Sequence, residues 1–146
     1  MSKGEEKIVS LLQKSKISFE REKSFKDLRR GLYRFDFCLT RNGKLILLEF
    51  QGEQHYQYVP KFYHSRSDFL KAKERDRKKI AYALAHNTPL YIIPYWEIDN
   101  LHTAADLFQS RFLAQTMWKN DMDWQQYRNL TKNSKVDIIK KKKTKR

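Results

Sequence analysis

Residues 33–51 decide the fold, and they read Tyr33-Arg-Phe-Asp-Phe-Cys-Leu-Thr-Arg-Asn-Gly-Lys-Leu-Ile-Leu-Leu-Glu-Phe-Gln51. The alternation over 33–40 predicts a strand, and the Asn-Gly pair within 41–44 is a strong hairpin signal. The nearly all-apolar run 45–51 predicts a second strand that is covered on both faces. These residues therefore predict an antiparallel hairpin near the centre of a sheet.

A parallel strand should lie next to this hairpin. The apolar run 90–94 predicts a buried strand, and residues 68–86 form a strong helical pattern that ends at Asn87-Thr88-Pro89. Because a helix connects 45–51 to 90–94, these two strands should be parallel. We expect an α/β fold with a mixed sheet flanked by helices, in a single domain over residues 1–130.

The remaining elements are shorter. Helical spacing predicts helices over 4–15, capped by Ser2, and over 103–118, while 18–26 alternates as an extended segment. Residues 121–130 fit either a short helix or a packed extension. The expected cap of the 68–86 helix is Ser67 or Asp68.

The charge points to a polyanion. The 146 residues carry a net charge of +14, and the segment 131–146 holds eight basic residues and one acidic residue. Such a tail is expected to be disordered until it binds, and a basic chain favours nucleic acid as partner, although a solvated face is the alternative interpretation.

Lone Cys38 excludes a disulfide scaffold and a cysteine-based zinc site. The absence of an apolar leader and of a long apolar run predicts a cytoplasmic protein with no membrane partner.

Two carboxylates stand in the hairpin strands. Asp36 lies between aromatic residues, and Glu49 ends the most apolar run of the chain. Burying carboxylates is costly unless they are paired, hydrogen-bonded or metal-bound, and hard oxygen ligands suit Mg²⁺ or Mn²⁺. The alternative is that each acid pairs with a basic neighbour such as Arg34.

These residues also resemble a known family. The order Gly4-Glu5-Glu6-Lys7-Ile8, Phe35-Asp36-Phe37, Leu47 to Tyr56 and Arg75 to Lys79 is similar to the PD-(D/E)XK nuclease superfamily, in particular its very-short-patch-repair-like branch. That branch is often found as small phage or mobile-element endonucleases. The resemblance covers about residues 4–98 and implies a restriction-endonuclease-like fold.

The resemblance implies roles for individual residues. Asp36, Glu49, the backbone carbonyl of Phe50 and Glu5 would hold Mg²⁺ or Mn²⁺. Gln51 is expected among the catalytic residues but stands where the motif has a lysine, so the cation must come from elsewhere.

The 68–86 helix offers a replacement for that lysine. Our hypothesis is that Lys79 is the functional cation and that Asp76 orients Lys79 or the preceding loop. The alternative is a surface array of Lys73, Asp76 and Lys79 on one helix.

The segment 52–67 supplies further candidates. His55 could act as a general base or contact the scissile phosphate, or it could simply stack on aromatic residues. The aromatic residues here could stack on bases or form a lid over the sheet. The expected nucleic-acid contacts are Tyr56, Lys61, Arg66, Lys140, Lys141, Lys142 and Lys143.

The leading functional prediction is a Mg²⁺-dependent DNA endonuclease that hydrolyses phosphodiester bonds. One alternative is a non-catalytic nucleic-acid-binding protein that keeps the fold, and another is a phage effector that acts through protein–protein contact. A homodimer is one arrangement that would bring two sites to a duplex.

Overall fold

The computed structural model describes residues 1–55 and 65–116. The predictions made for 56–64 and for 117–146, including the element at 121–130 and the basic tail, lie outside the described residues.

A four-stranded mixed sheet forms the centre of the protein. Its strands β1 (Phe19–Ser24), β2 (Arg34–Arg41), β3 (Lys44–Gln51) and β4 (Leu90–Pro94) lie side by side in chain order. β1–β2 and β2–β3 pair antiparallel, whereas β3–β4 pair parallel. The hairpin turns at Asn42 and Gly43, whose φ angles of 52° and 74° suit the tight turn predicted there. The hairpin and the parallel strand are therefore confirmed.

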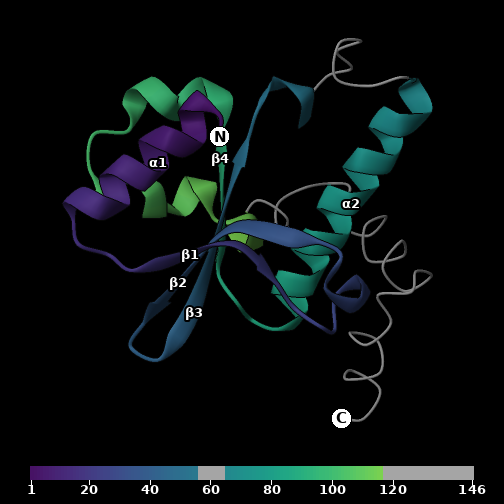
Figure 1. Ribbon diagram of the computed structural model, residues 1–146, viewed down its shortest axis with the longest axis horizontal. Helices are drawn as coiled ribbons and strands as arrows, with labels where there is room; N and C mark the ends of the chain where they lie inside the picture. The colour runs from purple at the N-terminus through teal and green to yellow at the C-terminus, as the bar shows by residue number, and fades with distance from the viewer. Residues whose placement is uncertain (56–64, 117–146) are drawn as a thin grey trace.

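Helices cover both faces of this sheet. α1 (Lys3–Lys14) lies on one side and α2 (Arg66–Ala85) on the other (Figure 1). The side chain of Ser2 accepts the backbone N–H of Glu5 and caps α1 as expected. α2 begins slightly earlier than predicted, and its cap is Ser65, not Ser67 or Asp68.

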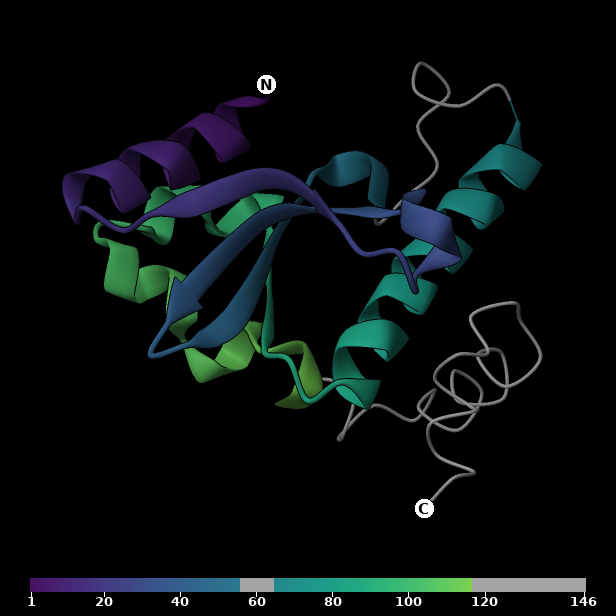
Figure 2. The same ribbon diagram turned by 60° about the horizontal axis from the view of Figure 1, so that its bottom comes forward.

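Each face of the sheet has its own apolar layer. Ile80 and Ala83 of α2 pack with Phe35 and Leu90, on the side where Cys38 is also buried. On the opposite side, α1 contributes buried residues to a cluster that also takes in the segment after β4; this cluster comprises Ile8, Leu11, Leu12, Phe37, Leu39, Leu48, Ile93, Leu101, Leu107 and Phe112. The protein is thus a layered α/β fold in which the sheet is covered on both sides (Figure 2).

The predicted helix over 103–118 is wrong over residues 103–113, whereas residues 114–116 are helical. The chain after β4 instead forms three 3₁₀ turns, η3 (Tyr95–Asn100), η4 (Ala104–Phe108) and η5 (Ser110–Phe112). Gln109 between the last two is extended, with φ −69° and ψ 142°, so no α-helix can run through it. Apolar residues spaced by three suit a 3₁₀ turn as well as an α-helix, which explains the misleading pattern.

Candidate functional site

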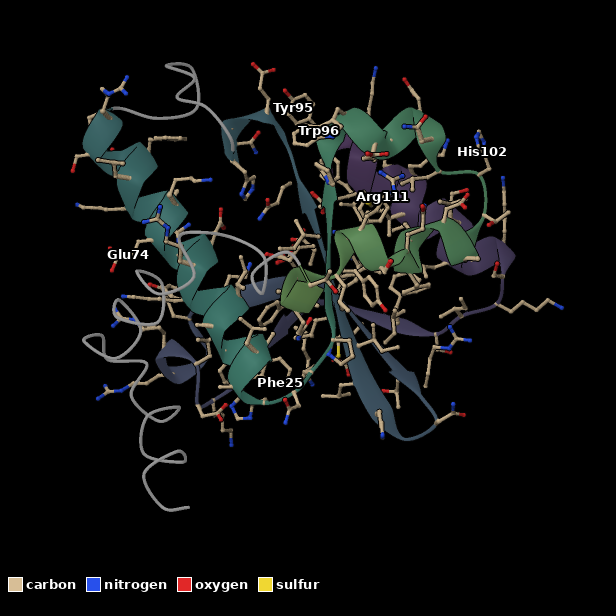
Figure 3. The ribbon with its side chains drawn as sticks, turned by 180° about the vertical axis from the view of Figure 1, so that it is seen from behind. Phe25, Glu74, Tyr95, Trp96, His102 and Arg111 are labelled. Carbon is tan, nitrogen blue, oxygen red and sulfur yellow. The ribbon has the colours of Figure 1, made fainter. Side chains whose placement is uncertain are left out.

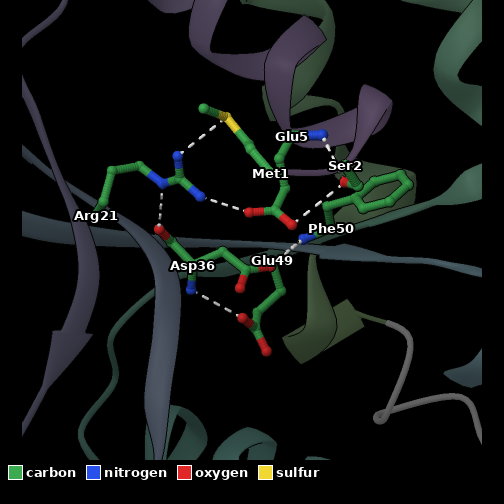
Figure 4. Close-up of polar contacts among 7 residues, drawn as sticks. All are labelled: Met1, Ser2, Glu5, Arg21, Asp36, Glu49 and Phe50. Atoms are coloured by element: carbon green, nitrogen blue, oxygen red, sulfur yellow. Dashed lines mark hydrogen bonds and ion pairs between the residues drawn. The ribbon is translucent and has the colours of Figure 1, made fainter. Parts of the chain in front are cut away.

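The candidate site begins where β2 and β3 separate. Regular pairing of these strands ends at Phe37 and Leu48, one position before Asp36 and Glu49. Beyond that point, each acid accepts a hydrogen bond from the other strand. The backbone N–H of Asp36 donates to Glu49 Oε2 over 2.9 Å, and the N–H of Phe50 donates to Asp36 Oδ2 over 2.8 Å (Figure 4). The two carboxylates therefore replace the missing ladder bonds and are fixed relative to each other.

Asp36 is a strongly perturbed acid. Burial, and next the neighbouring charge of Glu49, raise the pKa of Asp36 to about 8, against the opposing effect of the Phe50 N–H. A carboxylate held this way gains from any cation that enters the site, because the cation offsets the desolvation of its ionised form.

α1 brings Glu5 to the same place. Glu5 lies in the first turn of the helix, where its carboxylate accepts a hydrogen bond from the Ser2 hydroxyl over 3.2 Å. Gly4 makes this approach possible, because a Cβ at this position would lie 2.3 Å from the ring of Phe50. The missing side chain thus allows the start of α1 to rest on the residue next to Glu49.

β1 contributes two residues that the sequence reasoning missed. The guanidinium of Arg21 forms an ion pair with Glu5 and donates from Nε to the carbonyl oxygen of Asp36 over 3.2 Å (Figure 4). Glu22 takes a left-handed conformation with φ 53°, which is uncommon for a non-glycine residue. One carboxylate oxygen each from Glu22, Glu5 and Asp36 lie within 4.8 Å of one another.

The cation at the inner side of the site comes from α2. Lys79 is buried, and its ammonium group contacts Glu49 Oε1. Burial alone would lower the pKa of Lys79, but the contact with Glu49, and then Asp36 and Asp76, hold it above its ordinary value. Lys79 is therefore a charged lysine in the interior. The structure thus places Lys79, the predicted functional cation, at Glu49, while its function stays a prediction; Arg34, the alternative partner, is exposed.

His55 connects the segment after β3 to α2 through a contact with Asp76. It ends the short turn η2 (Glu53–His55), and its Nδ1 lies 2.8 Å from Asp76 Oδ2. Lys73 donates to the carbonyl oxygen of His55 over 2.5 Å, and burial lowers the pKa of Lys73. Asp76 thus orients the loop histidine, which was one of the two predicted roles. The surface array of Lys73, Asp76 and Lys79 is not what the structure shows.

Some of these side chains line a pocket of about 310 Å³, whereas Arg21, Glu22, Lys73 and Asp76 lie outside its lining. Of the described residues, Gln51 is buried but does not line it, so the prediction of a direct role at Gln51 has no support from the geometry. Arg66 lies at the exposed start of α2 and is not part of the pocket, while Tyr56, Lys61 and Lys140–143 lie outside the described residues. The lining residues are Ser2, Glu5, Asp36, Glu49, Phe50, Gly52, Gln54, His55 and Lys79.

The carboxylates offer the hard oxygen atoms that divalent cations such as Mg²⁺ take as ligands. Ligand oxygens on opposite sides of Mg²⁺ lie about 4 Å apart, since each Mg–O distance is about 2.1 Å. One carboxylate oxygen each of Glu5, Glu22 and Asp36 lies within 4.8 Å of the others. Lys79 and the Asp36 N–H engage the two oxygens of Glu49, and Arg21 and the Ser2 hydroxyl engage the two oxygens of Glu5.

Comparison with known proteins adds nothing to this geometry: no family model, curated protein or solved structure gives a significant match. Among the described helices, none combines the length and the apolar character that crossing a lipid bilayer requires.

Proposed function

We propose that the protein is a divalent-metal-dependent endodeoxyribonuclease with a restriction-endonuclease-like fold. The observation that carries the proposal is the convergence in one pocket of acids, a lysine and a histidine from separate elements. Glu5 comes from α1, Asp36 and Glu49 from β2 and β3, His55 from η2 and Lys79 from α2. Carboxylates beside a buried cation and an oriented imidazole are the groups that metal-assisted phosphodiester hydrolysis needs.

The acids would hold the ion. Asp36 and Glu5, with Glu22 beside them, are the proposed ligands, and Glu49 and the Phe50 carbonyl remain candidates from the family resemblance. When bound, Mg²⁺ or Mn²⁺ would act as a Lewis acid towards the phosphate and the attacking water.

The chain's own residues would complete the chemistry. Lys79 would place a fixed positive charge beside the scissile phosphate, in the role of the lysine that Gln51 replaces. His55, with Nδ1 on Asp76, keeps Nε2 as the ring nitrogen that can exchange a proton with water or a leaving oxygen. The close packing of Gly4 against the Phe50 ring would keep the Glu5 carboxylate in place within the pocket.

A second candidate rests on the ion pairs of the same acids. Glu49 forms an ion pair with Lys79, and Glu5 forms one with Arg21. Both carboxylates therefore have a cationic partner within the protein and need no metal ion to balance their charge. This arrangement favours a nucleic-acid-binding protein that keeps the fold but performs no hydrolysis.

A cleavage panel separates these candidates. The full chain is incubated with linear, mismatched and branched DNA in Mg²⁺, Mn²⁺ or EDTA, beside Asp36→Asn prepared in the same way. The nuclease proposal expects cleavage by the wild type that disappears in EDTA and in the variant. Binding without cleavage of any substrate would favour the second candidate.

A further inference from the structure

A second hollow adjoins the candidate pocket. It has a volume of about 550 Å³ and lies between α2 and the turn η1 (Arg29–Gly31) with the start of β2. Its described lining contains five basic residues and one acid, Glu74, which already lies 3.4 Å from Lys78. We call it the basic groove, and its lining residues are Leu32, Tyr33, Arg34, Lys71, Glu74, Arg75, Lys78 and Lys79.

One wall of the basic groove is a stripe of cations along α2. Lys71, Arg75 and Lys78 follow each other at intervals of four and three residues, so they share one helix face. From the first to the last, the helix rises about 10 Å at 1.5 Å per residue. Successive phosphates of a DNA strand advance about 3.4 Å along the duplex axis, so a stripe of this length can contact more than one phosphate.

The opposite wall offers an apolar and aromatic surface. The side chain of Leu32 is 68% exposed and supplies apolar surface on this wall. The guanidinium groups of Arg29 and Arg75 lie 5.7 and 5.9 Å from the ring centre of Tyr33. Cations on one wall and apolar surface on the other suit a nucleotide chain better than a simple anion, because a nucleotide offers both phosphate and sugar or base surface.

The basic groove and the candidate pocket share one lining residue. Lys79 lines both hollows, and its ammonium group lies at Glu49. Glu74 projects from the side of α2 away from the sheet, which marks the outer rim of the groove (Figure 3). A strand with its phosphate in the pocket would therefore have its neighbouring phosphates next to Lys71 and Arg75.

We propose that the basic groove binds the DNA backbone that flanks the scissile phosphate, with Arg34, Lys71 and Arg75 as its phosphate contacts. In the described part of the chain, none of these three residues forms an ion pair with an acid. The inference rests on the proposed function, since it assigns the path of the same substrate, but DNA binding can be measured without cleavage.

The test is a charge reversal on α2 with a matched control. Lys71→Glu/Arg75→Glu changes two exposed residues of the groove, and Lys14→Glu/Lys44→Glu makes the same change in charge at exposed positions elsewhere. All proteins are full-length and keep the basic tail. The Kd for a labelled DNA duplex is measured in EDTA over a range of salt concentrations, with an RNA oligonucleotide of the same sequence as a second probe. Thermal melting confirms folding, and Arg75→Gln is used if the double variant does not fold.

We expect the groove variant to bind DNA at least tenfold more weakly than the control variant. Its slope of log K against log salt should fall by about 2, at about 0.9 for each phosphate that the protein no longer neutralises. Equal Kd values for the two double variants would overturn the inference, as would a weakening confined to RNA. If the wild type cleaves DNA and the groove variant keeps full affinity, only the groove assignment fails. If no protein cleaves but the groove variant selectively loses DNA affinity, the nuclease proposal fails and the groove stands.

Discussion

The ammonium group of Lys79 on α2 contacts the carboxylate of Glu49 on β3, thirty residues away in the chain and in the interior of the protein. This contact joins α2 to the point where β2 and β3 separate. In the proposed nuclease, Lys79 would supply the charge that the motif lysine carries, since position 51 is Gln. The fold and the proposed chemistry therefore depend on the same ion pair.

Removing Lys79 alone should destabilise the protein strongly. Lys79→Met leaves Glu49 as an uncompensated buried carboxylate, and losses of about 3–5 kcal/mol are typical of a broken buried pair. The double variant Lys79→Met/Glu49→Gln should recover much of this loss, because it removes the orphaned charge as well. Urea denaturation of the wild type, the single variant and the double variant measures the free energy of unfolding of each protein. A double variant no more stable than the single variant would contradict the pairing.

Asp36 should make the metal-free protein less stable as the pH rises. Its pKa lies at about 8 in the folded state against an ordinary value of 3.8. Its contribution is therefore fully present below pH 4 and is lost as the pH rises through 8. Asp36→Asn removes this dependence and keeps an oxygen for the Phe50 N–H, so it should be the more stable protein at pH 8 in EDTA. Melting curves in EDTA between pH 4 and 8 compare the two. If the melting temperatures of the two proteins change with pH in the same way, the pKa of Asp36 is not raised in the folded state.

The Asp76–His55 contact should control the pH dependence of cleavage. His55→Ala should lower the rate by about 10²–10⁴-fold, the range typical of a lost general acid or base. Asp76→Asn weakens the partner of Nδ1 and should shift the pH–rate profile as well as lower the rate. Asp99→Asn changes an exposed carboxylate outside the pocket and serves as the control. An unchanged profile in Asp76→Asn would argue against an orienting role.

Gly4→Ala should weaken both stability and cleavage. The new Cβ would meet the Phe50 ring, so α1 or the ring must shift, at a cost of about 1–3 kcal/mol for an overpacked contact. Phe50→Leu in the same chain should relieve the crowding and restore part of the stability. Lys3→Ala, at the exposed neighbouring position, is the control. Chemical denaturation measures the free energy of unfolding, and a cleavage assay measures the rate. A Gly4→Ala variant with unchanged stability would contradict the close packing of Gly4 against the Phe50 ring.

Local patterns predicted the sheet and the positions of the main acids. The hairpin turn sets Asp36 and Glu49 on neighbouring strands, and the helical spacing that turned Asp76 inward also brought α2 to the site. Glu22 and Arg21 could not be found this way. Glu22 depends on a left-handed residue within a strand, and Arg21 joins Glu5 only through the tertiary packing of α1 against β1. No local pattern of residue types reports such contacts.

The most direct test of metal-dependent DNA cleavage is the single-turnover cleavage rate of DNA by the full chain as Mg²⁺ is titrated. The substrate is the best one in the panel, and Asp36→Asn is measured beside the wild type. We predict a wild-type rate that rises with Mg²⁺ to saturation, returns to baseline with EDTA, and falls by at least 10²-fold in the variant. A wild-type rate that never exceeds that of Asp36→Asn, in Mg²⁺ or in Mn²⁺, would contradict it.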